Sequence, residues 1–131
     1  MPYRQALSSQ ELNILIEKNK EIGNCFDAID EHIVLTDANA NIIYANKAVE
    51  KRTGYPITEI IGKNPGDLWG GNMPNKFYEK MWHRIKEEKI SFVGEVKNRR
   101  KDGTEYWQEL RIYPILDTSG EVMNLSQLNR M

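Results

Sequence analysis

The chain has 131 residues, of which 40% are hydrophobic and 28% are charged, and its formal net charge is −1. This length and composition are typical of one globular domain, and the balanced charge argues against nucleic acid or an anionic membrane as the main partner. Cys25 is the only cysteine in the sequence, which excludes an internal disulfide and any CxxC metal or redox motif.

The N-terminal segment is predicted to form a helix from about residue 9 to residue 22. Ser8 and Glu11 have the spacing of a capping box, which places the start of the helix. The first ten residues lack the apolar core of a signal peptide, and no apolar run approaches the roughly 20 residues of a membrane span. We therefore expect a cytoplasmic chain with no membrane contact.

A heptad pattern continues through this helix and beyond it. The pattern consists of five apolar residues and one asparagine: Leu12, Leu15, Asn19, Ile22, Phe26 and Ile29. It is consistent with a homodimer seam or with a helix packed on its own domain. Gly23 and Asn24 offer an earlier helix end, which would leave the last two apolar residues to the domain. We expect a flanking, dimerising helix over residues 1–24 and a sensor domain over residues 25–131.

Residues 33–44 are predicted to form a β-hairpin, because β-rich runs at 33–36 and 42–44 flank a turn-forming segment. Short helices should follow over "KAVEKRTGY", where Gly54 suits a helix C-terminus, and over "PITEIIGKN". The segment "PGDLWGGNMP" is predicted to be irregular, with one helical turn at most, and "NKFYEKMWHRIKEEK" to be the longest helix.

Three strands are predicted at residues 91–99, 104–114 and 121–129, joined by turns at 101–103 and 117–120. The strands are grouped apart from the helices along the chain. This order predicts an α+β fold in which an antiparallel sheet carries helices on one face.

Three amide side chains fall on or near the apolar face of these strands: Asn98, Gln108 and Asn129. Gln127 shares that face with Asn129. An unpartnered buried amide costs about 1–3 kcal/mol, so these groups must be satisfied. They can bond one another, the backbone or trapped water, or they can bind a ligand with an edge of donors and acceptors, such as a flavin ring.

The order and spacing of "IVLTDANANIIYANKAVEKRTGY", "EIIGKN", "NRRKDGTEYW" and "ILDTSGEV" resemble a PAS domain over about residues 26–130. The resemblance implies a five-stranded antiparallel sheet in the order 2-1-5-4-3, with helices enclosing a ligand-sized cavity. The stretch "IGKNPGDLWGGNMPNKFYEKMW" with "GEVKNRRKDG" is most similar to the subgroup that contains an FAD-binding redox sensor of nitrogen fixation. Members of this subgroup occur in sensor kinases and diguanylate cyclases.

The segment from Gly62 to Trp69 resembles the G-x-N-C-R-F-L-Q motif of light-oxygen-voltage flavin domains. Pro65 stands where those domains carry the photoactive cysteine, so covalent flavin photochemistry is not expected. The flavin-holding amides of those domains match the three amides named above. The resemblance thus implies a cofactor site for FAD or FMN that includes Asn64, Asn98, Gln108 and Asn129. The aromatic residues Trp69, Trp82 and Phe92 could complete the wall of this site, which then has seven residues, or could simply be part of the core.

Other kinds of site find little support in the sequence. His83 should face away from the apolar side of its helix, which argues against haem ligation. No His, Cys and carboxylate cluster predicts a metal, no nucleophile–base set predicts an enzyme, and alternation sends the charges of "KNRRK" to solvent. The sequence predicts a PAS sensor domain that responds to a ligand or redox state through dimerisation and acts on an output domain. The alternative is a ligand-free PAS module for protein interaction.

Overall fold

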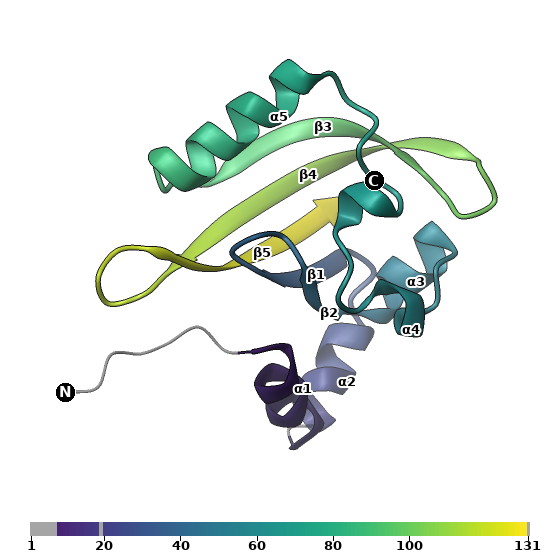
Figure 1. The fold of residues 1–131 in the computed structure, drawn as a ribbon. Helices are drawn as coiled ribbons and strands as arrows, with labels where there is room; N and C mark the ends of the chain where they lie inside the picture. Colours follow the sequence, from purple (N-terminus) through teal and green to yellow (C-terminus); the bar gives the residue numbers. More distant parts are fainter. Residues whose placement is uncertain (1–7, 19, 131) are drawn as a thin grey trace.

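Five antiparallel strands form one sheet in the order β2-β1-β5-β4-β3 (Figure 1). The computed structural model describes residues 8–18 and 20–130. The expected α+β fold and strand order are confirmed. The strands are β1 (His32–Asp37), β2 (Ile42–Ala45), β3 (Phe92–Arg99), β4 (Glu105–Leu116) and β5 (Val122–Arg130).

The register of the sheet decides which polar groups meet on its inner face. Gln108 on β4 lies opposite Val96 on β3, so Asn98 is its diagonal neighbour. Asn129 on β5 lies between His32 on β1 and Leu110 on β4. Side chains that are far apart in the sequence are thereby gathered at one end of the sheet.

Helices cover the inner face in two groups. α3 (Lys47–Thr53), α4 (Ile57–Ile60) and the 3₁₀ turn η1 (Pro65–Asp67) lie near β1 and β2, while α5 (Asn75–Trp82) runs alongside β3 and β4 (Figure 1). α3 ends at Gly54, as predicted, in a left-handed conformation at φ 78°. α5 continues directly into a π-helical segment, η2 (His83–Glu87), so the long helix that was predicted changes its winding part-way.

Two apolar clusters form the core under these helix groups. The first contains Val34, Ile42, Ala45, Val49, Ile60 and Trp69, and the second contains Ala40, Met81, Ile85, Phe92, Ile112 and Leu125. The first cluster joins α3 and α4 to β1 and β2. The second cluster joins α5 and η2 to the other strands. Residues of both clusters line the space between them.

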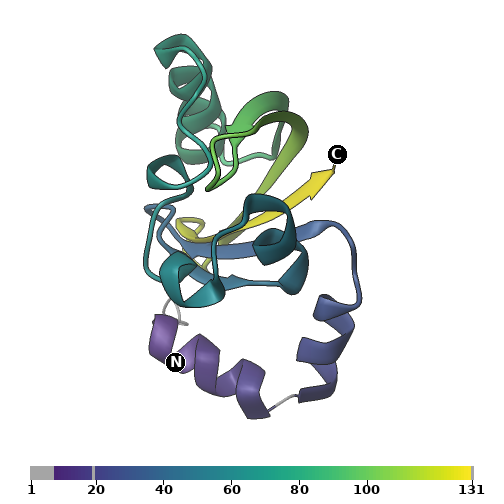
Figure 2. The same ribbon diagram turned by 90° about the vertical axis from the view of Figure 1, so that its right-hand side faces the viewer.

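The N-terminal segment differs from the single helix that was predicted. It forms α1 (Ser9–Lys18) and α2 (Lys20–Asp27), whose axes point in different directions (Figure 2). The suggested helix end at Gly23-Asn24 is wrong, since α2 continues to Asp27. A straight heptad seam from residue 12 to residue 29 is therefore not present.

The two apolar residues at the end of that pattern have separate positions. Phe26 packs on Tyr44 of β2 with ring centroids 5.8 Å apart, and Ile29 follows α2 with 42% of its surface exposed. Asn19 and the side chains of Leu12, Leu15 and Ile22 lie outside the described residues. Among the helices of the described ranges, none combines the length and apolar character needed to cross a membrane.

Candidate functional site

A cavity of about 260 Å³ lies between the two apolar clusters. No acidic, basic or histidine side chain lines it among the residues that the structure describes. Its wall is mainly apolar and aromatic, and four amide side chains supply most of its hydrogen-bonding capacity: Asn64, Asn98, Gln127 and Asn129. An apolar pocket with a few convergent polar groups is the usual form of a small-molecule site.

Five of the seven residues predicted for the site line this cavity: Asn64, Trp69, Trp82, Asn98 and Asn129. Gln108 is buried behind the wall and does not line the cavity. Phe92 is also buried elsewhere, where its ring meets Phe77 edge-on at 5.4 Å. The structure therefore assigns Gln108 and Phe92 to the support of the site.

Gln127 is a lining residue that the sequence reading did not single out. It lies on β5 two residues before Asn129, and strand alternation puts both side chains on the inner face. The alternation is visible in the sequence, but Asn129 is the only residue of this strand that matches a flavin-holding amide of the related domains. Its presence gives β5 two amides in the cavity wall.

Asn129 has a buried acceptor that is not satisfied. Its Oδ1 has no hydrogen-bond partner among the described residues, and its side chain is almost fully buried. Such a group is rare in a folded protein, because removing it from water without a new partner is costly. Since Asn129 lines the cavity, a donor on a bound molecule or water could satisfy it.

Gln108 is held between two other buried side chains. Asn98 Nδ2 donates to Gln108 Oε1 at 2.9 Å, and Gln108 Nε2 lies 3.2 Å from His32 Nδ1. Burial, together with the nearby Arg52 and Arg100 guanidinium groups, lowers the pKa of His32 to about 3. His32 is consequently neutral over the physiological pH range.

The glycine-rich loop forms one side of the cavity and is fixed to the edge of the sheet. The carbonyl oxygen of Trp69 accepts from Arg99 N at 2.8 Å and from Asn72 Nδ2 at 3.0 Å. The Asn72 amide also donates to Lys97 O at 3.2 Å. These bonds hold the Trp69 ring in the wall, where it also packs in the first apolar cluster.

Gly71 is the position in this loop where a side chain is least tolerated. Its φ is +80°, and a Cβ added there would lie 2.7 Å from Gly66 O. We expect Gly71→Ala to destabilise the domain by about 2–4 kcal/mol, from left-handed strain plus this clash. Gly62→Ala is the matched control, because Gly62 has φ +84° but nothing within 4 Å of the added Cβ. Urea unfolding of both variants would compare them, and equal losses would contradict the close packing of the loop.

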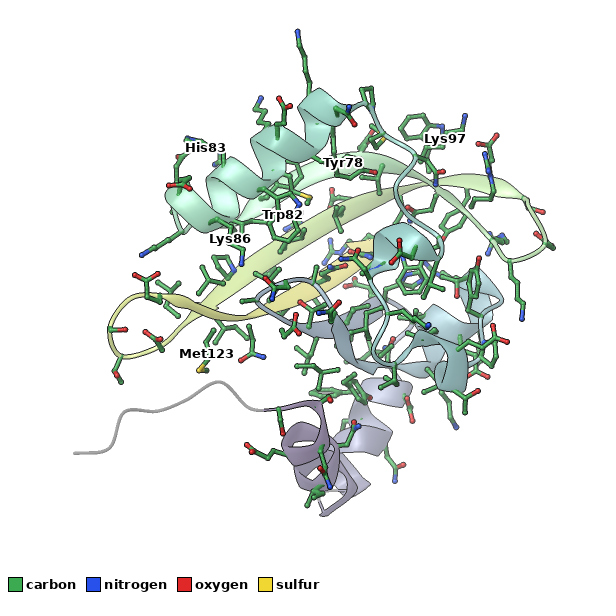
Figure 3. The ribbon with its side chains drawn as sticks, viewed as in Figure 1. Tyr78, Trp82, His83, Lys86, Lys97 and Met123 are labelled. Carbon is green, nitrogen blue, oxygen red and sulfur yellow. The ribbon has the colours of Figure 1, made fainter. Side chains whose placement is uncertain are left out.

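The opposite side of the cavity is formed by α5 and η2. Trp82 lines the cavity, and Lys86 Nζ lies 5.6 Å from the centroid of its ring. Lys86 also donates to Ala38 O in the β1–β2 turn, which ties η2 to the first hairpin. Figure 3 shows Trp82 and Lys86 on the side of the helix that faces the sheet.

His83 lies on the other side of this helix (Figure 3). Its side chain is 64% exposed and lies 3.6 Å from Glu88, so the prediction that it faces solvent is confirmed. Within residues 8–18 and 20–130, no group of three or more His, Cys, Asp or Glu side chains is arranged to hold a metal ion.

Comparison with known proteins agrees with this geometry. Residues 30–127 match the model of a family described as the PAS domain. The chain belongs to the PAS domain family. It is 36% identical over 98 residues to a nitrogen fixation regulatory protein of Klebsiella oxytoca, covering 75% of this chain and 20% of that protein.

The chain is also similar to part of a histidine kinase and to a PAS domain of known structure. A blue-light-activated histidine kinase of Brucella anthropi is 37% identical over 81 residues, covering 62% of this chain and 16% of that protein. The crystal structure of a PAS domain from Colwellia psychrerythraea has a TM-score of 0.74 and 26% identity, covering 86% of this chain and 95% of the other. The chain spans about a fifth of the length of the nitrogen fixation regulator that it matches.

Proposed function

We propose that this PAS domain is the sensory part of a larger signalling protein and that its cavity binds a small, uncharged, flat ligand. The observation that carries the proposal is the uncharged cavity wall, in which aromatic rings and four amides surround the unpartnered Asn129 Oδ1. Amides offer both donors and acceptors, which suits the edge of a heteroaromatic ring. Trp69 and Trp82 supply flat apolar surface for its faces.

A flavin ring fits this set of residues in chemical terms. The amides Asn98, Gln127 and Asn129 would hold its edge of N–H and C=O groups, and Asn129 Oδ1 is suited to an N–H of the ring. When bound, a flavin would supply one- or two-electron redox chemistry. Pro65 lines the cavity, and Cys25 is exposed and outside it, so no described thiol stands beside the ring.

The domain itself is proposed to be a receiver of signals rather than an enzyme. Ligand binding would favour one of two hydrogen-bond arrangements among the buried amides, and the strands would pass this bias to the ends of the domain. The output domain would be of the sensor histidine kinase or diguanylate cyclase type. The similarity to a histidine kinase of Brucella anthropi supports the first of these two types.

A ring-binding experiment tests the ligand proposal. Lumiflavin, the flavin ring without its ribityl side chain, serves as the probe. Quenching of the lumiflavin fluorescence reports binding. We expect Asn129→Leu to weaken binding by about tenfold or more, because a hydrogen-bonding group facing the ring is lost. Ser126→Ala, on the outer face of the same strand, should bind like the wild type. Equal affinities for all three proteins would contradict the assignment of Asn129.

A second function, self-association, is favoured by the outer face of the sheet. Apolar side chains gather there on β3 and β4, including Val93, Tyr113 and Trp107, which is 58% exposed. Glu109 and Arg111 lie on the same face and form an ion pair. A two-fold axis passing between Glu109 and Arg111 would bring each charge opposite its complement in a second copy, so we propose a second copy of this chain as the partner.

Sedimentation experiments test this interface. We expect Trp107→Glu to weaken self-association by about tenfold or more, because a charge would replace the most exposed aromatic side chain of this face and be buried in the interface. Ile90→Glu is the control, since Ile90 is exposed but precedes β3. Deletion of residues 1–22 should also weaken the dimer if the N-terminal helices contribute to it. A Trp107→Glu protein that remains fully dimeric would exclude the sheet face.

A further inference from the structure

The hydrogen bonds around Gln108 determine which nitrogen of His32 carries a proton. The oxygen of the Gln108 amide already accepts from Asn98, so the group near His32 is the amide nitrogen. An amide NH₂ donates but does not accept, and His32 Nδ1 must therefore be the acceptor. A neutral imidazole with an unprotonated Nδ1 carries its proton on Nε2.

This assignment has a consequence for the cavity. Asn98 uses its Nδ2 to bond Gln108, which leaves Oδ1 as the group that it offers to a ligand. If His32 instead carried its proton on Nδ1, Gln108 would have to turn its oxygen toward His32 and its nitrogen toward Asn98. Asn98 would then accept from Gln108 and offer Nδ2 to the ligand. The hydrogen bonds that join Asn98, Gln108 and His32 can thus run in either of two opposite directions.

The surroundings of His32 give each arrangement a different cost. In the arrangement where Gln108 donates to His32 Nδ1, the Nε2 proton of His32 has no acceptor among the described residues. Arg52 also has a buried Nη1 without a partner, and its guanidinium group lies near His32. In the reversed arrangement Nε2 would carry a lone pair in place of this unpaired proton. Because His32 remains neutral, the choice lies between the two tautomers alone.

We propose that His32, which lies behind the cavity wall, determines whether Asn98 accepts a hydrogen bond from the ligand or donates one to it. In the tautomer with the proton on Nε2, the site selects a ligand with a donor opposite Asn98, and a ligand with an acceptor there would drive the reversal. His32 is thus a positioning residue that acts through Gln108. The inference rests on the proposed ligand-binding function. It adds His32, which does not line the cavity, to the residues that determine the specificity of that site.

The register explains how the same reversal reaches the ends of the domain. His32 is the first residue of β1 and lies opposite Asn129 of β5. The neighbouring Glu31 pairs with Arg130 at the end of β5, with 2.9 Å between Arg130 Nε and Glu31 Oε1. A change at His32 therefore occurs where the linker from α2 and the last residues of β5 meet.

The protonated nitrogen can be observed directly by NMR of the whole chain labelled with ¹⁵N-histidine, without any ligand. The two histidine signals are assigned with His83→Gln, which leaves His32 as the only histidine in the sequence. We expect a protonated Nε2 and an unprotonated Nδ1 for His32 at pH 7. A protonated Nδ1 in the wild type would overturn the proposal by itself.

Asn98→Asp tests the coupling, which must act in both directions. An aspartate carboxylate only accepts, so Gln108 must turn its nitrogen toward it and its oxygen toward His32. We expect the His32 proton to move from Nε2 to Nδ1. Asn64→Asp changes a cavity-lining residue that takes no part in the hydrogen bonds joining Asn98, Gln108 and His32. This substitution should leave the His32 proton on Nε2. A His32 that keeps the Nε2 proton in Asn98→Asp, or that becomes doubly protonated, would overturn the proposal. Neither result depends on lumiflavin binding, so failure here is distinguishable from failure of the ligand proposal.

Discussion

We expect Asn46→Asp to lower the free energy of unfolding by about 3 kcal/mol or more, because it disrupts the hydrogen bonds of a completely buried side chain. Asn46 has no exposed surface. Its Nδ2 donates to Phe26 O at 2.9 Å and to Glu31 O at 3.0 Å, and more weakly to Ile29 O at 3.3 Å. An aspartate would place a carboxylate against these three carbonyl oxygens, where repulsion replaces attraction.

The same substitution retains one bond, which makes it informative. Asn46 Oδ1 accepts from Ile33 N at 3.0 Å, and an aspartate oxygen can do so as well. The substitution should therefore destabilise mainly the segment between α2 and β1. Amide hydrogen exchange should accelerate first in that segment. Asn39→Asp, in the exposed β1–β2 turn, is the matched control and should change stability by less than about 0.5 kcal/mol. An Asn46→Asp protein as stable as this control would show that the segment is held by other contacts.

The second large effect is a loss of stability in acid caused by His32. Its pKa is lowered from 6.5 in the unfolded reference to about 3 in the folded protein. Between these values the unfolded chain binds a proton that the folded one does not, so acid favours unfolding. The contribution is fully present above pH 6.5 and is lost as the pH falls toward 3. It amounts to up to about 1.4 kcal/mol for each pH unit in this window.

Urea unfolding from pH 7 to pH 4 measures this slope. His32→Gln cannot titrate, and its stability should depend less on pH than that of the wild type by about one proton. His83→Gln, which replaces an exposed histidine, is the matched substitution for comparison, and the carboxylates that also titrate in acid are the same in all three proteins. Parallel curves for the wild type and His32→Gln would mean that His32 becomes protonated without unfolding.

The sheet was predictable because its signals are local. Turn residues mark the hairpins, and alternation along each strand identifies the inner face, including the amides Asn98 and Asn129. The irregular loop was recognisable from its glycines and prolines, and the exposure of His83 followed from helical spacing. These features depend on residues a few positions apart, where the sequence is directly informative.

The position of Gln108 was not predictable, because it depends on contacts between distant strands. His32 and Gln108 are 76 residues apart, and only the register of β1, β5 and β4 brings them together. Alternation placed Gln108 on the inner face but could not say whether it reached the cavity or another side chain. The division of the N-terminal segment into α1 and α2 likewise departs from its heptad spacing, because packing against β2 outweighs a local pattern.

The central claim is that the cavity of this PAS domain holds a small, flat, uncharged ligand. The most direct measurement is mass spectrometry of the molecules released when freshly purified protein is denatured, with an absorption spectrum of the intact protein beforehand. We expect a heteroaromatic compound, released in near-equimolar amount from the wild type and in much smaller amount from Asn129→Leu. Protein that is fully folded, releases no such compound and does not bind lumiflavin would contradict the account and favour the interaction module.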